Sequence, residues 1–122
     1  KVGIHSNGSR PKVIQNILPK IDFIGMDIKT SGSNLESAAM TVNSNTEYEF
    51  RTTLYPKYIS INNCHIIARE LKYIVGAKEW VLQQYTNEFN KQLINPYSKE
   101  EILKILEKCN KIITTKLKGD SQ

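Results

Sequence analysis

The sequence predicts an α/β protein built on a parallel β-sheet, and two observations carry this prediction. Strand-like segments alternate with amphipathic helical segments along the 122 residues, and the connections are short. Such alternation favours parallel strands joined by right-handed helical crossovers. The segment from Ile21 to Met26 is also apolar on both of its faces, which is typical of a strand buried within a parallel sheet.

Four strands are expected, at residues 2–4, 21–29, 47–54 and 80–85, and a fifth is possible at 112–117. The 47–54 segment is rich in β-branched and aromatic residues, and Pro56 closes it. Residues 86–97 are polar and irregular, and no element is expected there.

The first two helices are short. We expect Ser9 to cap the first one, which has Pro11 in its first turn and ends at Pro19. The second is expected from Leu35 to about Val42, between two polar linkers.

The last two helices have clearer signals. One begins at Ser60 and ends at Gly76, and the pair Ser98 and Glu101 forms a capping box that opens the other. The stripe expected to face the core from the first of them is Ile61, Cys64, Ile67, Ala68, Leu71 and Ile74.

Composition excludes several classes of protein. The net charge of +5 comes from 17 basic and 12 acidic residues, and the lysines are scattered among glutamates, so the charge does not indicate a nucleic-acid partner. No run of about 18 apolar residues predicts a membrane span, and no signal-peptide pattern opens the chain. Two cysteines make no disulfide framework, which favours a cytoplasmic protein.

Polar residues that the strands do not need for folding follow four of the predicted strands. Ligands of parallel α/β sheets bind at the carboxyl ends of the strands, so these residues are candidates for one site. They are Ser6, Asn7, Asp27, Lys29, Arg51, Thr53, Gln83, Gln84 and Tyr85. A carboxylate beside an ammonium and a guanidinium suits an anionic or zwitterionic small ligand. The alternative is that Asp27 and Lys29 form a structural ion pair at the sheet.

Other reactive residues are weaker candidates. His5 could contact a ligand, although a hydrogen-bonded structural role is the commoner one for such a histidine. Cys64 and Cys109 both fall on apolar stripes and are expected to be core residues. His65 follows Cys64 directly, and neighbours on a helix point about 100° apart, which argues against metal binding by this pair. Dinucleotide, Walker and nucleophile-elbow motifs are missing.

Four sequence elements together resemble the C-terminal half of radical S-adenosylmethionine activating enzymes. They are HSNG at residues 5–8, MDIK at 26–29, YEFRTT at 48–53 and VLQQY at 81–85. The resemblance covers nearly the whole chain and is nearest to the anaerobic ribonucleoside-triphosphate reductase activating proteins, and more distant from the pyruvate formate-lyase activating enzymes.

The resemblance implies a partial (β/α) barrel segment, with four or five parallel strands and helices on the outer face. It also implies an S-adenosylmethionine site, with Asn7 on the cofactor, Asp27 and Lys29 on its ribose or methionyl part, and Arg51 on its carboxylate or ribose. His5 stands where the family often has aspartate, so the resemblance does not extend to a cation site at that strand.

By the same resemblance, the 4Fe–4S cluster of the family belongs to a CxxxCxxC segment that the sequence lacks. The 122 residues are therefore expected to be one domain or fragment, inactive by itself, from an oxidoreductase that activates a glycyl-radical enzyme of the anaerobic ribonucleotide reductase or pyruvate formate-lyase type. Two alternatives stay open, namely a non-enzymatic ligand- or partner-binding module and another barrel enzyme with a phosphate or carboxylate substrate. An open sheet edge near residues 2–4 would allow self-association.

Overall fold

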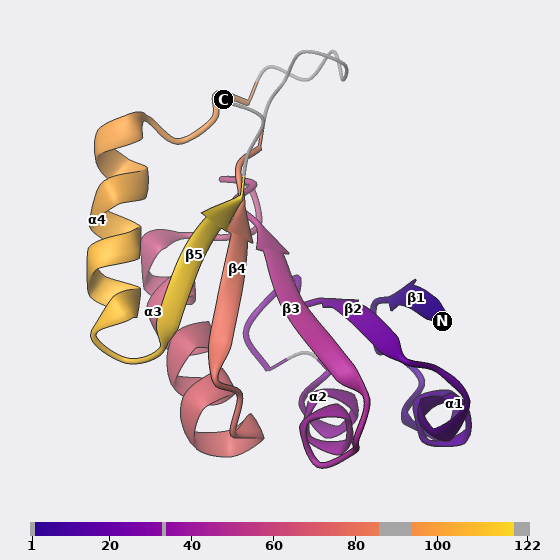
Figure 1. Cartoon of the computed structure of the whole chain (residues 1–122). Coiled ribbons are helices and arrows are strands. Elements are labelled where there is room, and N and C mark those ends of the chain that lie inside the picture. The colour runs from indigo at the N-terminus through magenta and orange to yellow at the C-terminus, as the bar shows by residue number, and fades with distance from the viewer. Residues whose placement is uncertain (1, 33, 86–93, 119–122) are drawn as a thin grey trace.

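The computed structural model describes residues 2–32, 34–85 and 94–118, which contain a five-stranded parallel sheet (Figure 1). The strands follow one another across the sheet in sequence order, and every neighbouring pair is parallel. They are β1 (Gly3–Ser6), β2 (Phe23–Asp27), β3 (Glu47–Thr53), β4 (Glu79–Gln83) and β5 (Thr114–Lys118). The predicted parallel α/β architecture is confirmed, and the fifth strand forms. Residues 86–93 of the segment expected to be irregular lie outside the described ranges.

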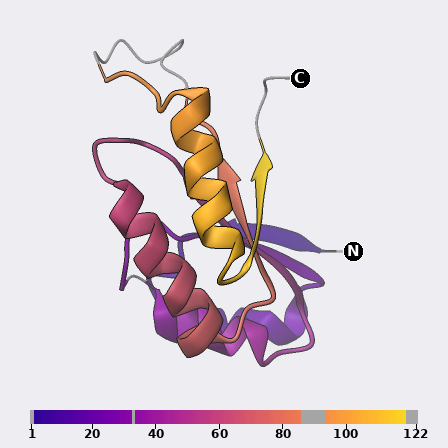
Figure 2. The ribbon, with the colours of Figure 1, turned by 90° about the vertical axis from the view of Figure 1, so that its left-hand side faces the viewer.

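The helices lie together on one side of the sheet and leave its other side open, as the two views in Figure 1 and Figure 2 show. They are α1 (Pro11–Ile17), α2 (Leu35–Val42), α3 (Ile61–Arg69) and α4 (Lys99–Asn110). A 3-10 turn, η1 (Leu18–Lys20), follows α1, and a π-helix, η2 (Glu70–Val75), continues α3. None of the helices in the described ranges has the length and apolarity that crossing a lipid bilayer requires.

The core fills the space between the sheet and the helices. Side chains alternate along each strand, so Ile24 and Met26 face the helices whereas Asp27 faces the open side. Phe50 and Trp80 supply the largest buried side chains on the next two strands. Because helices cover only one side of the sheet, every second strand residue points to the open side and is not needed for the core.

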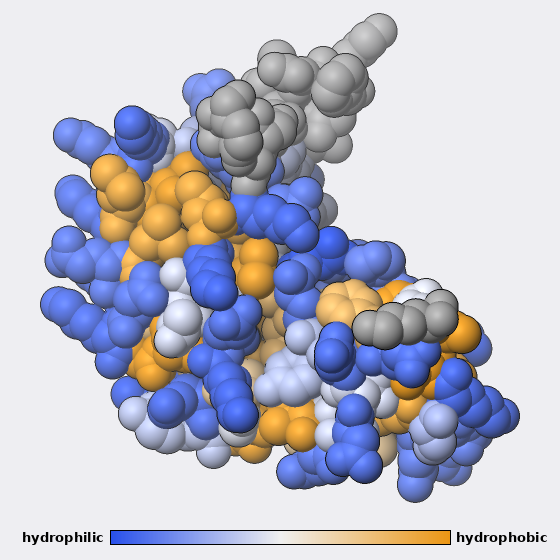
Figure 3. All heavy atoms as spheres, in the orientation of Figure 1, coloured by the Kyte–Doolittle hydropathy of each residue, from blue (hydrophilic) through white to orange (hydrophobic). Residues whose placement is uncertain are grey.

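The strands change direction strongly across the sheet. In Figure 1, β4 and β5 stand upright while β1 and β2 lie across the view, so the sheet curves around its open face as a barrel segment does. Figure 3 shows that this face is mostly hydrophilic, with apolar surface on the side of α4 and β5. Within the described residues β1 and β5 are the edge strands, each bonded to one neighbour.

The first helix begins differently from the prediction. Its N-cap is Arg10, which makes no side-chain cap, and Ser9 is not the capping residue. Pro11 occupies the first helical position and keeps the residue before it extended. Ser9 instead belongs to a turn, in which its N–H donates to Asn7 Oδ1 at 3.0 Å.

The third helix departs from its predicted stripe at its end. Ile74 is 62% exposed, whereas Val75 is 5% exposed. The last six residues are a π-helix, in which each residue advances by a smaller angle than in an α-helix. Val75 therefore lies on the same buried face as Leu71, and Ile74 points outward.

Candidate functional site

A pocket of about 670 Å³ lies at the carboxyl ends of β2, β3 and β4. Its position is the one predicted for ligands of a parallel α/β sheet. The lining residues are Asp27, Ile28, Lys29, Thr30, Arg51, Thr53, Tyr55, Tyr58, Ile59 and Tyr85. Five of the nine polar residues singled out from the sequence are in this lining, namely Asp27, Lys29, Arg51, Thr53 and Tyr85.

The charged residues reach the pocket from two neighbouring strands. Asp27 and Arg51 are cross-strand partners at the end of β2 and in β3, so both point to the open side. Strand β2 ends at Asp27, two residues earlier than predicted, so Lys29 follows the strand rather than belonging to it. Lys29 nevertheless lines the same pocket.

A buried hydrogen-bond chain holds the segment after β2 in place. Thr52 faces the helices, and its hydroxyl donates to the Ile28 carbonyl at 2.6 Å. The same oxygen accepts the indole N–H of Trp80 at 2.9 Å. The Ile28 amide also donates to the Arg51 carbonyl at 2.7 Å, so the chain between Asp27 and Lys29 is fixed from two directions.

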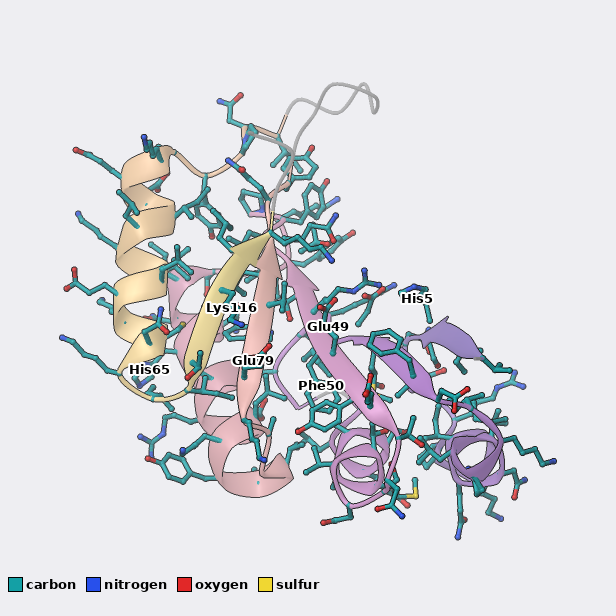
Figure 4. All side chains as sticks on the ribbon, in the orientation of Figure 1. His5, Glu49, Phe50, His65, Glu79 and Lys116 are labelled. Atoms are coloured by element: carbon teal, nitrogen blue, oxygen red, sulfur yellow. The ribbon has the colours of Figure 1, made fainter. Side chains whose placement is uncertain are left out.

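Arg51 is the centre of a group of charged and polar side chains, which we call the Arg51 cluster and define as His5, Asp27, Glu49, Arg51 and Lys118. Arg51 Nη2 lies 3.0 Å from His5 Nδ1 and 3.6 Å from Asp27 Oδ1. Arg51 Nε lies 3.8 Å from Glu49 Oε2, and Lys118 Nζ lies 3.8 Å from the same oxygen. Figure 4 shows His5 and Glu49 on the open side of the sheet.

The guanidinium of Arg51 keeps binding capacity despite these neighbours. Its side chain is 21% exposed, and Nε is buried without a hydrogen-bond acceptor in the described part of the chain. The 3.8 Å contact with Glu49 is electrostatic and too long to be a hydrogen bond. Because Nε has no accessible surface, a ligand oxygen would bind to the exposed part of the guanidinium, where a charge-assisted hydrogen bond can form.

Aromatic rings form the other wall of the pocket. Tyr55 lies between two tyrosines, with ring centroids 5.2 Å from Tyr58 and 4.6 Å from Tyr85. Lys57 Nζ is 5.6 Å from the Tyr58 ring. The sequence reasoning included Tyr85 but missed Tyr55 and Tyr58. Tyr55 could have been predicted, because Arg51, Thr53 and Tyr55 alternate along the chain and so point to the same side.

Asn7, the fourth predicted binding residue, lies beside the pocket and does not line it. Its side-chain oxygen accepts the Ser9 amide, as described above. Its backbone carbonyl accepts from the Asn34 side chain, which also donates to the Asp27 carbonyl at 3.2 Å. Asn34 thus ties the turn after β1 to the end of β2. Ser6, Gln83 and Gln84 are also absent from the lining.

The cysteines are core residues, as predicted. Cys64 on α3 and Cys109 on α4 are each 1% exposed. Burial raises the pKa of Cys64 to about 12 and that of Cys109 to about 11, which keeps both thiols protonated. In the described ranges no three histidine, cysteine or acidic side chains are grouped as a metal site would require.

The arrangement of the fold has a known counterpart. No family model and no curated protein sequence matches the chain. A crystal structure of a domain of pyruvate-formate lyase-activating enzyme from Bacteroides vulgatus ATCC 8482 superposes with a TM-score of 0.75. The alignment covers 95% of this chain and 80% of that one, at 13% sequence identity.

The two chains share a fold. At this identity the comparison supports the partial-barrel architecture that the sequence resemblance implied, and it carries no residue's role from one chain to the other.

Proposed function

We propose that this chain is the C-terminal part of a radical S-adenosylmethionine enzyme that activates a glycyl-radical enzyme, and that its pocket binds S-adenosylmethionine. The observation that carries the proposal is the convergence of Asp27, Lys29 and Arg51 on one pocket at the carboxyl ends of the strands. The resemblance of the sequence further favours an anaerobic ribonucleotide reductase type of partner.

The residues of the pocket suit the chemistry of this ligand. S-Adenosylmethionine carries a carboxylate, an amine, ribose hydroxyls and an aromatic base. Arg51 and Lys29 can take the carboxylate or a ribose oxygen, and Asp27 can take the amine or a hydroxyl. The tyrosine wall offers ring faces to the base. Asn7 contributes through its neighbour Asn34, which holds the turn against Asp27.

The iron–sulfur cluster does not fit the residues of this chain. Its two cysteines lie on separate helices, and their raised pKa values disfavour the thiolate that binds iron. In the proposal, reductive cleavage of bound S-adenosylmethionine would supply the radical that removes a hydrogen atom from the partner. The chain itself binds and orients the cofactor and excludes water from one side of it.

A titration of S-adenosylmethionine into the isotope-labelled chain, followed by NMR, tests the proposal. We expect shifts confined to the pocket, with a Kd of about 1 mM or weaker because only part of the cofactor's contacts is present. Arg51→Ala and Asp27→Ala should each weaken binding about tenfold, the effect of losing a charge-assisted hydrogen bond. Arg69→Ala, which removes an exposed arginine on α3, is the matched control.

The same titration separates the alternatives. Binding that Arg51→Ala and Asp27→Ala leave unchanged would mean that the pocket is not the site. Equal shifts with inorganic phosphate would favour a phosphate substrate or a general anion-binding module instead of S-adenosylmethionine.

A further inference from the structure

His5 reaches across an entire strand to contact Arg51. His5 is in β1 and Arg51 is in β3, and β2 lies between them. Neighbouring strands are about 4.8 Å apart, so the two backbones are separated by roughly twice that distance. Yet His5 Nδ1 is 3.0 Å from Arg51 Nη2. The imidazole therefore lies over the backbone of β2.

Gly25 is the residue over which the ring passes. It is the cross-strand partner of His5, and a Cβ built on it would lie 2.5 Å from His5 Nδ1 and 2.9 Å from Cε1. No side chain fits there while the ring keeps this position. The three glycines with a positive φ among the described residues are Gly8, Gly32 and Gly76, so the backbone of Gly25 does not itself require glycine.

A glycine inside a buried strand weakens the strand, and such a position often marks the close approach of another group. Here the approaching group is the His5 ring. The ring also makes an edge-to-face contact with Phe23, two residues before Gly25 in β2, with centroids 6.4 Å apart.

The contact fixes the chemical state of the imidazole. Arginine only donates hydrogen bonds, so His5 Nδ1 must accept and the ring proton must be on Nε2. A protonated imidazole has no acceptor and would place a second cation against Arg51. The carboxylates facing this pair are Asp27 from β2 and Glu49 from β3, and Glu49 is shared with Lys118 from β5.

We propose that His5, seated over Gly25, is the positioning residue that holds Arg51 toward the pocket, and that it does so only as the neutral imidazole. The proposal deepens the proposed function, because it makes binding of the carboxylate or ribose by Arg51 depend on the acceptor nitrogen of His5. Phe23 and Gly25 serve this contact by fixing the ring and by leaving space for it.

The first test needs no ligand. Nitrogen-15 NMR of the imidazoles in the complete chain should show His5 with an unprotonated Nδ1 and a protonated Nε2 at about pH 8, where imidazoles are neutral. His65 is the internal control, since it is exposed on α3 and far from His5 (Figure 4). A His5 that carries its proton on Nδ1 would overturn the proposal.

The second test follows Arg51 itself. In His5→Ala the Arg51 Nε–H signal should exchange faster with water, and S-adenosylmethionine affinity at about pH 8 should fall about three- to tenfold, the usual effect of one lost hydrogen bond. His5→Gln should restore most of the affinity, because the amide oxygen can accept from Arg51. Gly25→Ala should behave like His5→Ala. If it does not fold, the His5 variants decide the question.

Comparing affinity with stability separates positioning from a merely structural role. At about pH 8, His5→Ala should bind about three- to tenfold more weakly than His5→Gln, while the two variants unfold at similar urea concentrations. Equal affinities for the two variants would overturn the proposal. If S-adenosylmethionine does not bind even the wild-type chain, the proposed function fails, and the ligand-free Arg51 and His5 signals still decide the positioning role.

Discussion

Thr52→Val is the perturbation whose effect follows most directly from the structure. Valine keeps the shape and the strand preference of threonine but cannot donate or accept a hydrogen bond. Thr52 is 2% exposed, and its hydroxyl bonds both the Trp80 indole and the Ile28 carbonyl. The residues Trp80 and Ile28 are themselves 0% and 2% exposed. The substitution therefore leaves a buried donor and a buried acceptor without partners.

The magnitude can be worked out from these two groups. Each unsatisfied buried group destabilises the fold by about 1–3 kcal/mol. The additional apolar carbon of valine returns about 0.8 kcal/mol at most. We expect a net loss of about 1–5 kcal/mol, out of a total stability of about 5–15 kcal/mol for a domain of this kind.

Urea unfolding measures this loss. Trp80 is the single tryptophan, so its fluorescence reports the transition, and far-UV circular dichroism checks it independently. A loss of this size moves the midpoint by about 0.5–2.5 M at a denaturant slope of about 2 kcal/mol/M. Thr53→Val is the matched control, because Thr53 is the next residue in β3 and is exposed on the opposite face. Equal midpoints for the two variants would refute the reasoning.

Two further outcomes follow from burial and backbone geometry. Gly8 and Gly32 both have a positive φ, but a Cβ on Gly8 would lie 2.8 Å from Met26 Sδ, whereas one on Gly32 has nothing within 4 Å. Gly8→Ala should therefore lose at least about 1 kcal/mol more than Gly32→Ala in urea unfolding, and equal losses would contradict the steric argument. Unfolded cysteines have a pKa near 9.0, against about 12 and about 11 for folded Cys64 and Cys109. Between pH 9 and 11 the unfolded chain releases protons that the folded chain keeps, so Tm should fall with rising pH, and less steeply in the Cys64→Ala, Cys109→Ala double variant.

The sequence by itself determined the architecture of this protein. The bounds of α2 and the capping box at Ser98 were predicted correctly, because such signals depend on residues a few positions apart. The parallel direction of the strands was also predicted correctly, since short helical crossovers leave little choice of direction. The burial of Cys64 and Cys109 followed from helical periodicity alone.

The lining of the candidate site was most directly predictable where strand alternation applies. Asp27 and Arg51 are directly opposed in neighbouring strands, and their convergence follows from parity. Asn7 lies in the turn after β1, where its side-chain oxygen accepts the backbone N–H of Ser9. Strand alternation therefore does not predict the direction in which the Asn7 side chain points. Ile74 was misplaced for a related reason, because a π-helix breaks the periodicity that the prediction assumed.

Only the tertiary structure decided what surrounds Arg51. His5 and Arg51 are 46 positions apart and belong to strands that are not neighbours, and Gly25 alone makes the space through which they meet. Neither the hydrophobic pattern of the sequence nor the register of two paired strands predicts this contact, because it depends on how the His5 ring lies across β2. The sequence names the residues, and the curvature and register of the sheet bring them within 3.0 Å.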